Sequence, residues 1–356
     1  MLDFIVNILV FAVVMGTIVF VHELGHLIAA KSFGVYCREF AIGMGPKLFT
    51  YQSKKSETSY TIRALPIGGF VAMAGEPGEA GMDEVPLENT IEGIARWKKL
   101  IILLAGVFMN IVLAFIVFMG IFQTIGVIRE PEPVIAQVAP GFPAEDAGFM
   151  MDDRIIKLTF YDGTVVEPKT FSDASIAIMS FEDNPIEVEV LRNGSIVTLE
   201  VTPSFNEATD TYVMGIQAYP GSMEKVNMLE TIKYTVGYII NSIVQILMVL
   251  KLLVRGIGLN NVGGPIAIFQ ATSEVTSSGF DFLYLFNLIG ALSISLAVMN
   301  LIPIPVLDGG RALLTVVEMV IRRPIPKKFE NVVMLVGVAF LLAVMIFFII
   351  NDISRF

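Results

Sequence analysis

The stretch "FIVNILVFAVVMGTIVFVHELGHLIAAKSFG", residues 4–34, decides how this chain folds. Its first part, Phe4–Val21, is almost wholly apolar and just long enough to cross a bilayer as a helix. His22, Glu23 and His26 follow at once, and the chain has no other histidine. Because ionisable side chains are costly at membrane depth, their presence there predicts a functional site.

The composition of the whole chain is that of an integral membrane protein. Of its 356 residues, 54% are hydrophobic and only 16% are charged, and long apolar runs recur. There is no basic face of the kind that binds nucleic acid, so nucleic acid is not an expected partner. The single cysteine, Cys37, excludes an intrachain disulfide. Residues 1–20 lack the basic start and cleavage site of a signal peptide, so we expect them to be retained as a span.

Four segments are expected to cross the membrane: Phe4–Val21, Leu100–Val127, Phe282–Ile302 and Val332–Ile350. A fifth apolar segment, Met228–Val254, is interrupted by polar residues, namely Glu230, Lys233, Asn241, Gln245 and Lys251. Such a pattern is typical of a helix that lies on the membrane surface or against protein, so we expect this segment not to cross.

Two β-rich regions separate the spans. Residues 35–75 contain two expected strands, "LFTYQ" and "TSYTIRAL", around a Lys/Ser turn, and their place between two spans predicts a membrane-associated β-hairpin. A later region alternates short strands with turns. It includes the hairpin signal "IEVEVLRNGSIVTLEV" and a short helix over Phe171–Met179. This region predicts an inserted α+β domain.

The expected domain order follows from these segments. Residues 1–128 form the first half of a membrane core, and residues 129–205 form the α+β domain. Residues 206–275 form a linker and a membrane-surface helix, and residues 276–356 complete the core. The fold class is therefore an α-helical integral membrane protein of four transmembrane helices with an inserted α+β domain.

His22 and His26 are four residues apart, so on a helix they share one face and can bind one metal ion. Glu23 lies beside that face, where it can reach a water molecule on the metal and take its proton. The spacing predicts a hydrolytic zinc site, although iron or cobalt would also accept such ligands. A chance cluster of polar residues at a helix end is the alternative, and it leaves unexplained why both histidines of the chain lie here.

Catalytic zinc usually has three protein ligands and one open position. Because no other histidine exists, a carboxylate is the expected third ligand. Asp308, in "MNLIPIPVLDGGRALL", is the best candidate, since it lies just after an apolar span and among helix-breaking Pro and Gly residues. Taken alone, Asp308 would more often be a helix cap or a turn residue.

Three motifs together resemble the site-2 proteases, which are intramembrane zinc metalloproteases. They are the HExxH motif after the first span, "GGFVAMAGE" at residues 68–76 and "NLIPIPVLDGG" at residues 300–310. The segment "VAPGFPAEDAGFMMDDRIIKL" at residues 138–158 resembles a PDZ domain, and the whole arrangement is similar to the bacterial branch with one such domain. Two positions depart from the family: Val107 stands where proline is frequent, and "MMDDRI" stands where a Gly-Asp turn is usual.

The resemblance implies a set of functional residues. His22, His26 and Asp308 would hold one zinc ion, and Glu23 would be the catalytic base. Substrate would be bound by Asn300 and Asn110, and by strand addition along the hairpin at residues 35–75, where the resemblance places these residues: Gly68, Gly69 and Phe70. The two glycines would allow close backbone approach, or they are ordinary loop residues.

The resemblance also implies an activity and a place in the cell. The expected substrates are single-span membrane proteins or peptides, such as anti-sigma factors or remnant signal peptides, cut within or near the span. The expected location is the bacterial cell membrane. The PDZ-like domain would either exclude bulky proteins from the site or dock a peptide C-terminus, and both readings stay open.

Charge gives an independent expectation of the topology. Basic residues gather in Lys31–Lys99 and Arg322–Lys328, whereas acidic residues dominate between Arg129 and Lys225. The positive-inside rule then places the basic loops in the cytoplasm and the acidic domain outside. With four spans, the HExxH motif and Asp308 reach the same, cytoplasmic side of the membrane.

Two other classes of function fit the sequence less well than a protease. A membrane scaffold with a structural zinc site would need a closed set of four ligands, and it gives Glu23 no use. An ion transporter would carry polar residues deep within several spans. The segment Val332–Ile350 has none, so the protease is preferred.

Overall fold

The computed structural model describes residues 2–52, 56–76, 84–129, 131–180, 184–206, 211–254, 265–277 and 280–354. The chain forms two compact units. Unit 1 comprises Met1–Phe122 and Met228–Phe356, and unit 2 comprises Gln123–Asn227. Unit 2 is therefore an insertion between the two halves of unit 1.

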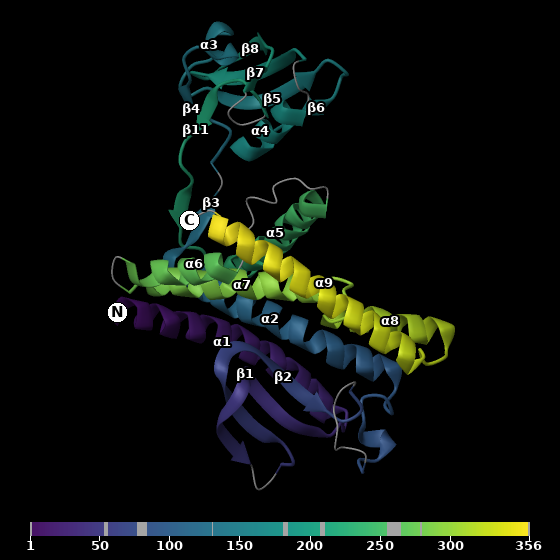
Figure 1. Ribbon diagram of the computed structural model, residues 1–356. Coiled ribbons are helices and arrows are strands. Elements are labelled where there is room, and N and C mark those ends of the chain that lie inside the picture. Colours follow the sequence, from purple (N-terminus) through teal and green to yellow (C-terminus); the bar gives the residue numbers. More distant parts are fainter. Residues whose placement is uncertain are drawn as a thin grey trace. The chain divides into compact units, whose positions relative to one another are not determined.

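Unit 1 is mostly helical (Figure 1). Its helices are α1 (Leu2–Ser32), α2 (Arg96–Ile125), α5 (Met228–Val254), α6 (Pro265–Ser277), α7 (Phe282–Leu301), α8 (Asp308–Ile321) and α9 (Lys327–Ser354), with a 3₁₀ turn at Leu87–Asn89. Five of the described helices, α1, α2, α5, α7 and α9, are long and apolar enough to cross a membrane. The chain is thus a multi-pass membrane protein. Length and composition do not decide whether α5 crosses, so the number of four spans stays a prediction.

Helices α1 and α7 run side by side in the same direction. Thr276, shortly before α7, hydrogen-bonds Asn7 near the start of α1, and Asn300 near the end of α7 contacts His22 near the end of α1. Between these points the two helices share one apolar core, formed by Val10, Val14, Ile18, Leu285 and Ile289 among others. The shared direction brings the ends of both helices to one level, where the two histidines lie.

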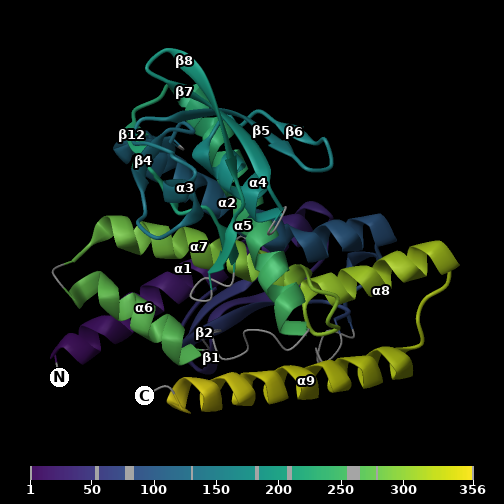
Figure 2. The same ribbon diagram turned by 90° about the horizontal axis from the view of Figure 1, so that it is seen from above.

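Helix α2 runs antiparallel to α1. Helix α5 packs against the second half of α2. Ile102 at the start of α2 contacts His26, whereas Asn110, two turns later, contacts the earlier His22. Four aromatic rings pack where α2 meets α5, namely those of Phe118, Phe122, Tyr234 and Tyr238. In the two views at right angles, α5 runs across α7 rather than alongside it (Figures 1 and 2).

Strands β1 (Cys37–Gln52) and β2 (Ser59–Met73) form the predicted hairpin, but both are longer than "LFTYQ" and "TSYTIRAL". The strands extend because residues 39–42 of β1 pair with two segments of β2, residues 59–62 and residues 69–72. Gly43, Gly45 and Gly68 have positive φ and allow the strands to bend between these segments. The expected Lys/Ser turn at residues 53–55 lies outside the described residues.

Unit 2 is an α+β unit. Its central sheet has the order β6-β5-β7-β8, and three strand pairs, β4-β11, β9-β10 and β3-β12, accompany it. The strands are β3 (Val127–Arg129), β4 (Ile135–Val138), β5 (Arg154–Phe160), β6 (Val165–Val166), β7 (Ile186–Arg192), β8 (Ser195–Val201), β9 (Ser204–Asn206), β10 (Thr211–Val213), β11 (Ile216–Ala218) and β12 (Ser222–Glu224). The helices are α3 (Pro143–Asp146) and α4 (Phe171–Ser180), and α4 agrees with the predicted helix.

Local sequence explains two features of unit 2. The β7–β8 hairpin turns at Asn193 and Gly194, both with positive φ, as an Asn-Gly turn requires. Asp152 also has positive φ, and aspartate is one of the few residues that tolerate this conformation. Unit 2 extends beyond residue 205, because β11 and β12 return to pair with β4 and β3. The domain boundaries expected from the sequence stay predictions.

Candidate metal centre

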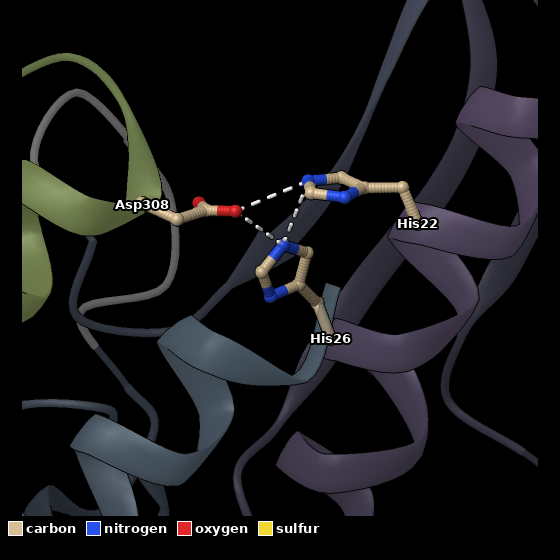
Figure 3. Close-up of side chains that lie close together, drawn as sticks. All are labelled: His22, His26 and Asp308. Carbon is tan, nitrogen blue, oxygen red and sulfur yellow. Dashed lines mark hydrogen bonds and ion pairs between the residues drawn. The ribbon is translucent and has the colours of Figure 1, made fainter. Parts of the chain in front are cut away.

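Helix α1 presents His22 and His26 on one face, and the first residue of α8, Asp308, faces them (Figure 3). Nε2 of His22 lies 3.1 Å and Nε2 of His26 lies 3.2 Å from Oδ2 of Asp308. The two Nε2 atoms are 3.3 Å apart. Among the described residues, these three side chains form the only group of histidine and acidic residues close enough together to hold a metal ion.

The three donor atoms have the spacing that one zinc ion requires. Zinc binds nitrogen and carboxylate oxygen at about 2.0–2.1 Å, so tetrahedral ligands lie roughly 3.3 Å apart. The donor atoms form a triangle of nearly that size. Oδ2 of Asp308 is buried and accepts no hydrogen bond from the described residues, which leaves it available as a ligand atom. The residues therefore fit a zinc ion with one open position.

The ring of His26 is oriented by α2. Its Nδ1 lies 2.8 Å from the carbonyl oxygen of Ile102, to which it can donate. Donation from Nδ1 leaves the lone pair of Nε2 free for a metal, which is the usual second-shell arrangement. The backbone of α2 comes this close because residue 106 is glycine: a Cβ there would collide with Nε2 of His26 and with the ring of His22.

Asn110 is fully buried and lies beside Nδ1 of His22, whereas Nε2 of the same ring faces Asp308. Its amide contacts Nδ1 of His22 at 3.3 Å, and its Oδ1 has no hydrogen-bond partner among the described residues. Rotation of this amide by about 180° would bring Oδ1 to Nδ1 of His22, as the acceptor that this nitrogen needs when Nε2 binds a metal. Ser293 of α7 donates to the carbonyl oxygen of Asn110 and ties the backbone there to α7. Asn110 thus lies behind a candidate ligand, and its predicted contact with substrate stays a prediction.

Asp308 reaches the histidines because the chain turns tightly between α7 and α8. A Cβ on Gly309 or Gly310 would collide with the carbonyl oxygens of Leu301 and Ile304. The two glycines thus let α8 begin directly against the preceding turn. Asn300 at the end of α7 lies 3.3 Å from Nε2 of His22, so this predicted substrate residue is at the metal centre.

Glu23 lies between the metal centre and the last segment of β2. Its electrostatic neighbours are the three candidate ligands and Glu76. A Cβ on Gly69 would lie 3.1 Å from Cγ of Glu23 and 2.8 Å from Cγ1 of Val19, so β2 passes directly against α1 here. This close approach is the reason for glycine at position 69. Gly68 has positive φ, and the guanidinium of Arg63 lies over the ring of Phe70, 4.9 Å from its centroid.

Sequence reasoning missed an ion pair at this centre. Arg311 of α8 donates to Glu76, which follows β2, at 2.6 Å. Both side chains are largely buried. The signal in the sequence was the position of Arg311, three residues after Asp308 and therefore on the same side of a helix. Nothing in the local sequence identified Glu76 as its partner.

Unit 2 contains a cavity of about 350 Å³ of its own. It is lined on one side by α4, with Ser175, Ile178 and Met179, and on another by β11, with Ile216 and Gln217. Among the described strands, one edge of β11 pairs with β4 in a two-stranded sheet. A strand edge beside an apolar cavity is suited to bind an extended peptide.

Comparison with known proteins gives a consistent result. The family profile described as peptidase family M50 matches residues 10–344. A Clostridium perfringens protein named as a zinc metalloprotease is 36% identical over 95% of this chain and 96% of its own length. A Staphylococcus aureus protein named as a zinc metalloprotease is 30% identical over the full length of both chains. The protease Eep of Enterococcus faecalis is 29% identical over 98% of this chain and 99% of its own.

Proposed function

Because this chain belongs to peptidase family M50 and is a zinc metalloprotease of the site-2 protease group, we propose that it cuts peptide bonds within or beside the membrane spans of single-span proteins. The observation that carries this proposal is the position of the metal centre. His22 and His26 lie on the apolar helix α1, and Asp308 reaches them from the start of α8, directly after the turn that follows the apolar helix α7. A bond cut there lies at membrane depth.

The protein uses zinc, and the proposed ligands are His22, His26 and Asp308. When bound there, zinc supplies a Lewis acid that polarises the scissile carbonyl and lowers the pKa of a water molecule. Glu23 is the proposed base: its carboxylate would take a proton from the attacking water and would later deliver it to the leaving amine. During the reaction, Asn110 would orient the ring of His22 and the carbonyl of Ile102 would orient the ring of His26.

The edge of β2 at residues 68–73 is the proposed substrate-binding strand. A helical substrate must be unwound before it can be cut, and its freed backbone groups need hydrogen-bond partners in lipid. Pairing with a strand edge supplies them. Gly69 brings this edge against Glu23, so a paired substrate would pass the base. Asn300 is the proposed clamp on the substrate, because it lies beside His22 at the end of α7.

Four spans are proposed, with α5 lying along the membrane. Helices α1 and α7 run in the same direction, and α2 runs between them in the opposite direction. An even number of crossings must therefore separate α2 from α7, and a single crossing by α5 does not meet that condition. The course of α5 across α7 is consistent with this (Figure 2). By the charge rule, the metal centre faces the cytoplasm and unit 2 lies outside.

Unit 2 is proposed to be a PDZ-like domain that docks the C-terminus of a peptide. The cavity between α4 and β11 favours docking over mere obstruction, because a size filter needs no apolar pocket beside a strand edge.

The direct test compares the native protein with Glu23→Gln in proteoliposomes that contain a tagged single-span substrate. The variant keeps the side-chain size and the metal ligands but removes the base. We expect zinc content to be unchanged and cleavage to fall by about 100-fold or more. A Glu57→Gln variant, at a partly exposed site of the hairpin loop, is the matched control. Equal cleavage by Glu23→Gln would remove Glu23 from the mechanism, and a cut outside the span and its flanks would refute intramembrane cleavage.

A further inference from the structure

Helix α8 carries the third candidate ligand but buries only small residues: Gly309, Gly310, Ala312 and Thr315. Five of its large apolar residues are exposed, namely Leu313, Val316, Met319, Val320 and Ile321, whereas Leu314 and Val317 are partly buried. The glycines pack α8 against the turn that precedes it in the chain. Few large side chains of α8 therefore interlock with neighbouring elements, and a polar contact near Asp308 adds to what this packing supplies.

Arg311 supplies a contact of a different kind. It lies three residues after Asp308, so the two side chains project from the same side of α8. Its guanidinium donates to Glu76 at 2.6 Å, and the two side chains are only 21% and 13% exposed. A charge-assisted bond in such a partly desolvated position is shorter and stronger than one in water. The pair therefore resists rotation of α8 on the side that faces the histidines.

Glu76 is a fixed anchor for this contact. Its backbone follows the β2 edge and is held by a turn, in which its N–H donates to the carbonyl of Met73. The preceding Ala74 is bonded on both sides, by its N–H to Tyr36 and by its carbonyl to Ile91. Gly75 has positive φ and packs against Thr90. Glu76 consequently connects the proposed substrate strand to α8.

We infer that the Glu76–Arg311 ion pair is a positioning link, which holds Asp308 in register with the histidines and with the substrate-binding edge of β2. Neither residue is a metal ligand or contacts the reacting atoms in this role. The inference rests on the proposed function for the identity of the ligands and the strand. It adds that the third ligand is held by a segment that belongs to the substrate site.

The test measures zinc affinity in the purified full-length protein, by competition with a chelating dye. Glu76→Gln and Arg311→Gln each remove the ion pair, and we expect zinc to bind about 10-fold more weakly or worse, as for other groups that orient ligands. Arg311→Lys keeps the charge and is expected to retain most of the affinity. In excess zinc, both Gln variants are expected to regain most of their cleavage activity, because a positioning residue is not needed for the chemistry itself.

Two further variants make the result decisive. Glu189→Gln breaks an ion pair of 2.7 Å with Lys157 in unit 2 and is expected to leave zinc affinity unchanged. The charge swap Glu76→Arg with Arg311→Glu is expected to recover part of the loss, which a merely unfolded protein would not. Native affinity in both Gln variants, or lost activity that excess zinc does not restore, would overturn the link. His22→Ala separates the two proposals: if it too binds zinc normally, the metal site itself is wrongly assigned.

Discussion

The positions of His22 and His26 in the candidate metal centre depend on a small neighbouring residue, Gly106, as well as on the two imidazole rings. Gly106 lets α2 approach so closely that its backbone carbonyl at Ile102 can orient His26, and the same approach brings Asn110 to His22. The position after this glycine, Val107, is where related proteases often have proline. Val107 is buried in a continuous helix, so the departure does not disturb the approach of α2.

Gly106→Ala is expected to disable the metal centre. The added Cβ would collide with Nε2 of His26 and push α2 or the ring away. Zinc content should fall, and cleavage should drop by at least 10-fold, both measured on purified protein. Gly120→Ala is the matched control on the same helix, because nothing lies within 4 Å of a Cβ there. If both variants keep full zinc content, close approach at residue 106 is not required.

At the scale of single elements, the β1–β2 hairpin is held by a buried carboxylate. Glu39 is 8% exposed and bonds to Lys47 at 2.9 Å and to Arg63 at 2.8 Å. Burial alone would raise the pKa of Glu39, but the hydrogen bonds from these two cations lower that pKa below its ordinary value of 4.5. The ionised form is therefore favoured by folding, which makes the stability of the hairpin depend on pH.

Glu39→Gln is expected to destabilise the protein by about 1–3 kcal/mol at pH 7, because the largely buried Arg63 and the more exposed Lys47 lose the carboxylate that both contact. The pKa of Glu39 is lower in the folded than in the unfolded chain. Its contribution is thus complete above pH 4.5 and is lost as the pH falls through the folded pKa. Thermal unfolding in nanodiscs should show a difference from the native protein at pH 7 that shrinks toward pH 4. A constant difference at both values would contradict this account.

The cavity of unit 2 makes a prediction about α4. Met179 lines the cavity and is 40% exposed, whereas Ile176 is 61% exposed on the same helix and does not line it. Met179→Glu should weaken binding of a peptide with a free apolar C-terminus, and Ile176→Glu should not. Fluorescence anisotropy with the full-length protein measures both, and an amidated peptide tests whether the terminal carboxylate is read. Equal binding by all variants would show that this cavity is not the docking site, and no binding by the native protein would favour the size-filter role.

At the scale of the whole molecule, the topology can be read with introduced cysteines. The native Cys37 is fully buried, and burial raises the pKa of its thiol to about 12, so it contributes little background labelling. The two ends of the region that contains α5 are marked by Met228 and Phe280, both exposed. A membrane-impermeant maleimide then reports the side on which each lies.

Met228→Cys and Phe280→Cys are both expected to be labelled from outside intact cells. Glu88→Cys, in the loop between β2 and α2, should be labelled only after permeabilisation. Labelling of Met228→Cys and Phe280→Cys from opposite sides would mean that α5 crosses the membrane. In that case α7 would begin on the cytoplasmic side and run opposite to α1, which the shared direction of these two helices contradicts.

By itself, the sequence determined the membrane class, the zinc motif, the α5 segment as an element of mixed polarity, and the β7–β8 hairpin. These features follow from local spacing and local turn chemistry, which a reader of the chain sees directly. It also indicated Asp308 as the third ligand, although only by exclusion. Tertiary structure decided which distant residues meet: the approach of α2 at Gly106, the position of Asn110 behind His22, and the Glu76–Arg311 pair. Such contacts depend on which helix faces meet, and the identity of a packing partner far along the chain leaves no periodic trace in the sequence.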